Sequence, residues 1–119
     1  MANTNYPTEI TLHQQSKSLE LAYGEQRYNL PAEYLRVYSP SAEVRGHGAG
    51  QEVLQTNKEQ VGIAQLEPSG NYALKIYFDD GHDSGLFTWD YLYELSTEYD
   101  ENWQDYLNRL EKAGYQRQG

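Results

Sequence analysis

The spacing of apolar residues changes along this 119-residue chain, and that change constrains the fold more than any other feature. Apolar and polar side chains alternate over residues 8–14, 19–23 and 72–78, which is the period of half-buried strands. Over residues 103–110 the apolar side chains recur at i, i+3, i+4 and i+7, which is one face of a helix. We therefore predict an α+β fold, a small antiparallel β-sheet with helices packed on it.

Helix boundaries can be predicted from capping residues. Pro31 is expected at the first position of a short helix over Ala32–Val37, because a proline there loses no intrahelical hydrogen bond. Two C-terminal helices follow. Thr88 is expected to cap the first and Asp100 the second, and Gly114 is expected to end the second.

The clearest strand, residues 72–78, runs into Asp79-Asp80-Gly81-His82. Asp-Gly is a strong hairpin signal, since both residues tolerate positive φ. We therefore predict a tight turn here, with a return strand over residues 84–87. Pro68-Ser69-Gly70-Asn71 is predicted to form another turn.

The chain length supports one domain with one core over residues 1–119. Its ordered part is expected over about residues 7–113. Residues 45–60 hold three glycines and little apolar content, so they are predicted to form a mobile loop.

The charge is uneven, with nine acidic residues and no lysine or arginine between Lys75 and Arg109. The stretch is either a solvated helical face or a docking surface for a basic partner. Nucleic acid and anionic membrane surfaces both require clustered basic residues, so neither is an expected partner.

The chain has no cysteine, which excludes disulfides and thiolate chemistry. The N-terminus has neither a basic region nor an apolar core, so no signal peptide is predicted. No apolar run approaches the ~20 residues needed to span a bilayer. A cytoplasmic protein is therefore expected.

Two polar segments, residues 35–48 and 78–85, carry two of the three histidines. His82 has aspartates around it, an arrangement that suits a metal or a general base but also occurs in exposed turns. His47 lies among glycines beside Arg45, without the strand, helix and lysine of a phosphate-binding loop. A metal site from His47, His82, Glu43 and an aspartate is possible, although the spacing is not diagnostic.

Serine hydrolase chemistry is not favoured. Ser39 and Ser41 flank Pro40 without the Gly-x-Ser-x-Gly elbow that activates a serine nucleophile. These two serines are more consistent with bracing a turn.

Several motifs together resemble the DUF971 family, the gamma-butyrobetaine hydroxylase-like N-terminal domain. The resemblance covers roughly residues 7–113. Its motifs are Leu35-Arg36, Ser39-Pro40-Ser41-Ala42-Glu43-Val44-Arg45-Gly46-His47-Gly48, Asp80-Gly81-His82 and Trp89-Asp90-Tyr91-Leu92.

In carnitine-pathway dioxygenases the related domain binds a structural zinc through three cysteines and a histidine. The resemblance places Ser39, Ser41, Val44 and His82 at those positions. Only His82 keeps a ligand type, so neither a conventional zinc site nor another cofactor is expected. The resemblance also implies that the serine-proline segment packs close to His82.

No catalytic dioxygenase barrel is expected within these 119 residues. Similar domains are attached to P-loop ATPases that carry iron–sulfur clusters, which suggests an accessory role in metal-cofactor or protein assembly. We therefore expect a non-catalytic adaptor that binds a protein partner, and its oligomeric state is left open. The alternatives are a metal-binding protein or metal-dependent enzyme using His47, His82 and nearby carboxylates, or a purely structural locus. The candidate binding residues are Tyr38, Ser39, Ser41, Glu43, Arg45, His47, Asp80 and His82.

Overall fold

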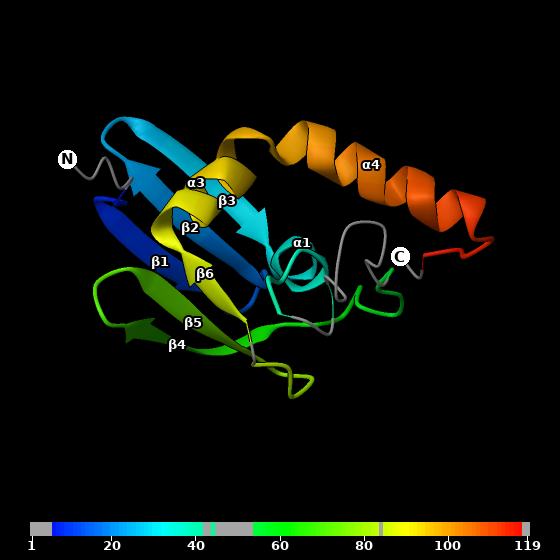
Figure 1. Ribbon diagram of the computed structural model, residues 1–119, viewed down its shortest axis with the longest axis horizontal. Coiled ribbons are helices and arrows are strands. Elements are labelled where there is room, and N and C mark those ends of the chain that lie inside the picture. Colours follow the sequence, from blue (N-terminus) through cyan, green and yellow to red (C-terminus); the bar gives the residue numbers. More distant parts are fainter. Residues whose placement is uncertain (1–5, 42–43, 45–53, 84, 118–119) are drawn as a thin grey trace.

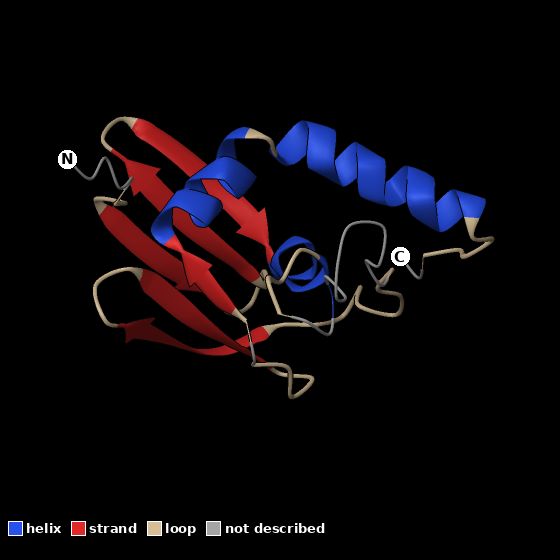
Figure 2. Cartoon of the chain, viewed as in Figure 1, coloured by secondary structure: helices blue, strands red, loops and turns tan. Residues whose placement is uncertain are grey.

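A computed structural model of the chain describes residues 6–41, 44, 54–83 and 85–117. Two three-stranded antiparallel sheets and the helices beside them form the described part (Figures 1 and 2). The first sheet has the order β1-β2-β3, formed by β1 (Glu9–His13), β2 (Ser18–Tyr23) and β3 (Gln26–Pro31). The second has the order β4-β5-β6, formed by β4 (Ile63–Ser69), β5 (Ala73–Phe78) and β6 (Leu86–Thr88).

Three described helices connect or follow these sheets. They are α1 (Ala32–Val37), α3 (Trp89–Thr97) and α4 (Tyr99–Lys112). Helix α3 lies across the first sheet, and α4 extends away from the sheets toward one end of the molecule (Figure 1). The predicted α+β class is confirmed, with the strands divided between two sheets. In the described part of the chain, no helix combines the length and the apolar character needed to cross a membrane.

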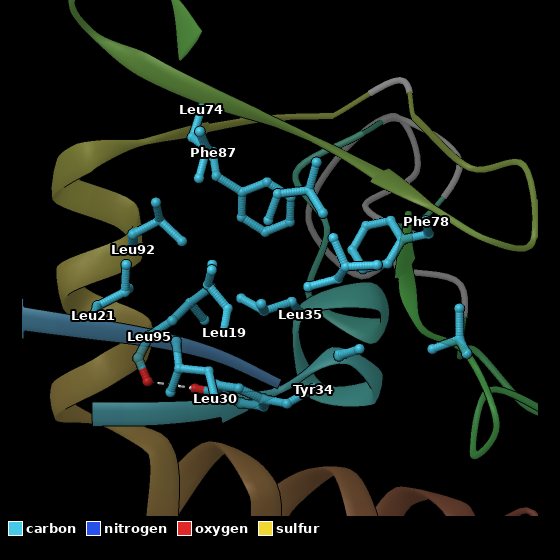
Figure 3. Close-up of a cluster of buried hydrophobic side chains, with 14 of the residues drawn as sticks. Leu19, Leu21, Leu30, Tyr34, Leu35, Leu74, Phe78, Phe87, Leu92 and Leu95 are labelled. Atoms are coloured by element: carbon cyan, nitrogen blue, oxygen red, sulfur yellow. Dashed lines mark hydrogen bonds between the residues drawn. The ribbon is translucent and has the colours of Figure 1, made fainter. Parts of the chain in front are cut away.

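The main core lies between the sheets, α1 and α3. Leucines from β2, β3, α1 and α3 meet Ile76 and Phe87 of the second sheet there, and all are nearly inaccessible to water (Figure 3). Tyr34 is fully buried in this core, and its hydroxyl donates to the carbonyl oxygen of Leu95 at 2.7 Å. Burial raises the pKa of Tyr34 above its usual range. A tyrosine can occupy a core when its hydroxyl has such a partner.

The predicted caps are partly confirmed. Thr88 accepts a hydrogen bond from the backbone N–H of Tyr91 at 3.1 Å, as expected of an N-cap. Pro31 lies one position earlier than predicted, at the N-cap of α1. Asp100 is not the cap of α4, because Glu98 occupies that position. Asp100 instead lies in the first turn, where the helix dipole favours a negative charge.

Gly114 ends α4 as predicted, with a positive φ of 78°. The N–H of Tyr115 donates to Leu110 and that of Gly114 to Glu111, the pattern of a Schellman motif. Pro68 and Ser69 were predicted to form a turn but are the final two residues of β4. A proline is tolerated there because β4 is at the edge of its sheet.

The hairpin predicted after β5 is confirmed in part, since β6 returns antiparallel to β5. A turn forms, since the N–H of Phe78 donates to the carbonyl oxygen of His82 and Gly81 has a positive φ of 91°. The return strand β6 begins at Leu86, opposite Lys75, so it shares residues 86 and 87 with the predicted 84–87 but starts two residues later. Gly85, just before this strand, packs against the segment after α1.

A second, smaller core fastens α4 to the molecule through Val37, Tyr106 and Leu110. Residues 54–60 of the predicted mobile loop are held beside it. The Tyr106 hydroxyl donates to the carbonyl oxygen of Gln55, and the Tyr115 hydroxyl donates to Glu59. Residues 45–53 of that loop lie outside the described residues.

Candidate functional site

Two serines and a histidine from distant parts of the sequence form a buried cluster, which we call the clasp: Ser39, Ser41 and His82. The His82 Nε2 lies 2.9 Å from the Ser39 Oγ and 3.3 Å from the Ser41 Oγ. All three side chains are buried, with exposed fractions of 0% for Ser39, 5% for Ser41 and 6% for His82. The clasp therefore joins the chain after α1 to the turn after β5, out of contact with bulk water.

Local structure positions both halves of the clasp. Ser39 follows Tyr38, the C-cap of α1, and its N–H donates to the carbonyl oxygen of Arg36. The turn after β5 presents His82, with its ring tilted against Phe78 at 6.0 Å between centroids. Gly85 closes the cluster, since a Cβ built there would lie 2.5 Å from the Ser39 Oγ. Only a glycine allows this close approach of the two segments.

Asp80 ties the same turn to its surroundings. Its Oδ1 accepts the backbone N–H of His82 at 3.1 Å, and its Oδ2 lies 2.9 Å from the Arg36 Nε and 3.5 Å from the Lys58 Nζ. Partial burial acts to raise the pKa of Asp80, but the His82 N–H and the two cations outweigh it. The pKa of Asp80 is therefore lowered.

A pocket of about 290 Å³ opens beside the clasp, between α1, α3 and α4. Ser39 belongs to both the clasp and the wall of this pocket. Its apolar wall comes from Val37, Val44, Leu54 and Leu95, and its polar and aromatic wall from Tyr38, Ser39, Gln55, Tyr91, Glu94, Asn102, Tyr106 and Arg109. The volume is close to the lower end of small-ligand pockets, which begin at about 300 Å³.

The tyrosines of the pocket are braced by backbone carbonyl groups. The hydroxyl of Tyr38 donates to Asn102 at 2.8 Å and that of Tyr91 donates to Tyr38 at 2.6 Å. Burial raises the pKa of Tyr38, although the nearby Arg109 guanidinium acts in the opposite direction. These bonds fix the shape of the wall, so the pocket is formed before any ligand arrives.

Arg109 is the only basic side chain among the described residues that line the pocket. Its Nη2 donates to the Tyr38 Oη at 3.3 Å, and its guanidinium lies 5.9 Å from the centre of that ring. Its Nε is buried and, within the described chain, makes no well-directed hydrogen bond, although Asp105 lies 3.1 Å away. Poor direction weakens a contact of this length, so charge attraction rather than a directed hydrogen bond joins the Nε to Asp105.

The candidate residues fall into three groups. Ser39, Ser41 and His82 come together as the resemblance implied, and Asp80 braces the turn that presents His82. Tyr38 lines the pocket. The remaining candidates, Glu43, Arg45 and His47, lie outside the described residues.

Sequence reasoning missed the part of the pocket that α4 contributes. Asn102, Tyr106 and Arg109 recur at spacings of three and four, so they share one helical face. The spacing alone predicts core packing for Tyr106, and the sequence marks Arg109 only as the end of the acidic stretch. The signal that could have identified them is a basic residue on the same face as the apolar stripe.

The donor atoms of the clasp do not suit a structural zinc. Such sites use thiolate sulfur and imidazole nitrogen, whereas Ser39 and Ser41 offer neutral hydroxyls and Val44 offers no donor. Within the described ranges, no group of three or more histidine or acidic side chains is placed to hold a metal ion. His47, which the metal-binding alternative requires, is outside those ranges.

Known proteins resemble this chain in sequence and in fold. The family model described as gamma-butyrobetaine hydroxylase-like, N-terminal, matches residues 10–93. One NMR solution structure is 60% identical with a TM-score of 0.85, covering 97% of this chain and 91% of that one. Another is 45% identical with a TM-score of 0.81, covering 98% and 88%.

A crystal structure of a DUF971 protein of unknown function from Acidithiobacillus ferrooxidans ATCC 23270 is also similar. It is 32% identical with a TM-score of 0.64, and the match covers 81% of this chain and 98% of that one. No curated protein matches the sequence.

Proposed function

We propose that this chain, which belongs to the gamma-butyrobetaine hydroxylase-like N-terminal family, DUF971, is a non-catalytic module that binds a segment of a partner protein. The observation that carries the proposal is a closed clasp beside an open pocket. Ser39 and His82 hold each other in the interior, whereas the pocket next to them is accessible.

The clasp is poorly arranged for nucleophilic catalysis. A serine nucleophile must meet its substrate, but Ser39 is fully buried. The carboxylate of Asp80 is used by the backbone N–H of His82 and by Arg36, which are structural contacts. We therefore assign the clasp a positioning role: it holds the Tyr38–Ser39 wall of the pocket in place.

The pocket has the features of a protein-binding surface. Tyrosine and arginine, the residue types enriched at interaction hot spots, line it together with aliphatic side chains. A cytoplasmic location is part of the proposal, and the absence of cysteine is compatible with it. The family resemblance further suggests an accessory role in metal-cofactor or protein assembly.

Affinity capture from cell extract tests this proposal. The double variant Glu94→Lys/Arg109→Glu reverses both charges of the pocket, and Glu67→Lys on the exposed part of β4 serves as the control. We expect the pocket variant to lose partners that both the wild type and the control retain. The same partners on all three proteins would contradict the proposal.

A further inference from the structure

Arg109 carries the only positive charge among the described residues of the pocket wall, and it is held in place from one side. The Tyr38 hydroxyl accepts from its Nη2, and the Tyr38 ring lies beneath the guanidinium. Its ionic neighbour Asp105 is 66% exposed, so water weakens that pair. The guanidinium therefore keeps capacity to bind a second anion.

The other polar groups of the pocket are less available. The hydroxyls of Tyr38, Tyr91 and Tyr106 each donate to a backbone carbonyl oxygen. A ligand anion would thus find its charged donor at Arg109. A carboxylate suits a guanidinium best, because two parallel hydrogen bonds can form.

The rest of the ligand has to be apolar and small. The pocket volume of about 290 Å³ lies near the lower end of small-ligand pockets, which begin at about 300 Å³. The aliphatic wall includes Val37, Leu54 and Leu95. The chain has a net charge of −9, which repels free anions, so apolar contact must supply much of the affinity.

Glu94 favours a peptide over a simple organic acid as the ligand of the pocket. It is an exposed carboxylate at the same pocket, and it can accept an N–H that an aliphatic acid does not have. The last residue of a protein chain combines an apolar side chain, a free carboxylate and a backbone N–H. We infer that the pocket captures the C-terminal residue of a partner chain, with its carboxylate on Arg109. This inference rests on the proposed function.

Two matched peptides test the inference by chemical-shift titration of the full chain. Both are N-acetylated pentapeptides of glycine and serine that end in phenylalanine, one with a free carboxylate and one with a terminal amide. We expect shifts at the pocket and an affinity at least about tenfold higher for the free carboxylate, the usual worth of a charge-assisted pair. Arg109→Gln should remove this preference, and the control Lys112→Gln, on the same helix, should keep it.

Each other outcome is decisive. Equal binding of the acid and the amide would overturn carboxylate recognition and leave the proposed function standing. Binding of 3-phenylpropionate with no binding of either peptide would make the pocket a small-molecule site and contradict both claims. No binding by any probe would overturn the inference.

Discussion

The clasp and the pocket share Ser39, yet they treat polar groups in opposite ways. In the clasp, the hydroxyls of Ser39 and Ser41 share a buried imidazole nitrogen. In the pocket, the Arg109 side chain is 40% exposed, and its ion-pair partner Asp105 is itself exposed to water. The comparison teaches that a buried polar group with partners holds a fold together, whereas a partly exposed charge at an opening is available to a ligand.

This contrast predicts that the clasp determines the stability of the fold, whereas the pocket determines ligand binding, although both use Ser39. Changes to the clasp should alter the free energy of unfolding, and changes to the pocket should alter ligand affinity. Five variants or conditions test this division, ordered from the largest expected effect on stability to the smallest.

The first test replaces the hydrogen bonds of the clasp with a bound zinc ion. The triple variant Ser39→Cys/Ser41→Cys/Val44→Cys supplies three thiols that can join His82 as ligands, and the N–H of Val44 already donates to the carbonyl oxygen of Ser41 one turn away. Zinc should then stabilise the fold by about 4 kcal/mol when present a thousandfold above its dissociation constant. Thermal unfolding with zinc or a chelator measures this effect.

The wild type is the control for the triple variant, because its hydroxyls are poor zinc ligands. A triple variant that folds but whose melting temperature is insensitive to zinc would show that residues 39, 41, 44 and 82 do not converge as a tetrahedral site requires.

The second removes the imidazole. His82→Ala should lower the free energy of unfolding by about 3 kcal/mol, because it leaves a cavity and deprives two buried hydroxyls of their partner. Urea denaturation measures the loss. The control is His13→Ala, at a histidine whose side chain is 42% exposed, and its effect should stay within about 0.5 kcal/mol. Equal effects at the two positions would remove the distinction on which the clasp depends.

The third crowds the clasp. Gly85→Ala should cost about 2 kcal/mol, because the new Cβ would lie 2.5 Å from the Ser39 Oγ and 3.1 Å from the backbone nitrogen of Ser41. Removing the hydroxyl in Gly85→Ala/Ser39→Ala should make the combined cost less than the sum of the two single costs. Additive costs in this double-mutant cycle would mean that the two segments are not in contact.

The position of Gly85 also shows where prediction from sequence ends. The helix face of α4 and its end at Gly114 follow from spacing and local backbone geometry, so they were predictable. The close approach of Gly85 to Ser39, 46 residues earlier in the chain, was not predictable, because it is a long-range contact. A local Asp-Gly signal contains no information about such a contact.

The candidate site divides in the same way. Residue patterns indicated His82 and the serines as separate motifs, and only the family resemblance placed them together. The pocket combines α1, α3 and α4, so no single segment of sequence indicates it. Arg109 is recognised as a pocket residue only when Tyr38 is seen beneath it.

The fourth lowers the pH. The folded state lowers the pKa of Asp80, so its carboxylate stabilises the fold, by up to about 1 kcal/mol. This stabilisation is fully present above the usual carboxylate pKa of about 4, and it is lost as the pH falls through the lower pKa of the folded state. Asp80→Asn should therefore be less stable than the wild type at pH 6. The gap should narrow toward pH 2 in urea titrations. A constant gap would assign the effect of the substitution to something other than its charge.

The fifth tests the pocket side of the comparison. Arg109→Gln and Glu94→Gln should each change the free energy of unfolding by no more than about 0.5 kcal/mol, because Glu94 is exposed and Arg109 is 40% exposed in a pair with an exposed aspartate. Urea denaturation beside the peptide titrations measures stability and affinity on the same samples. If Arg109→Gln destabilised the fold as much as His82→Ala, Arg109 would be a structural partner of Tyr38. The pocket would then belong to the same scaffold as the clasp, and the assignment of a ligand to its guanidinium would fail.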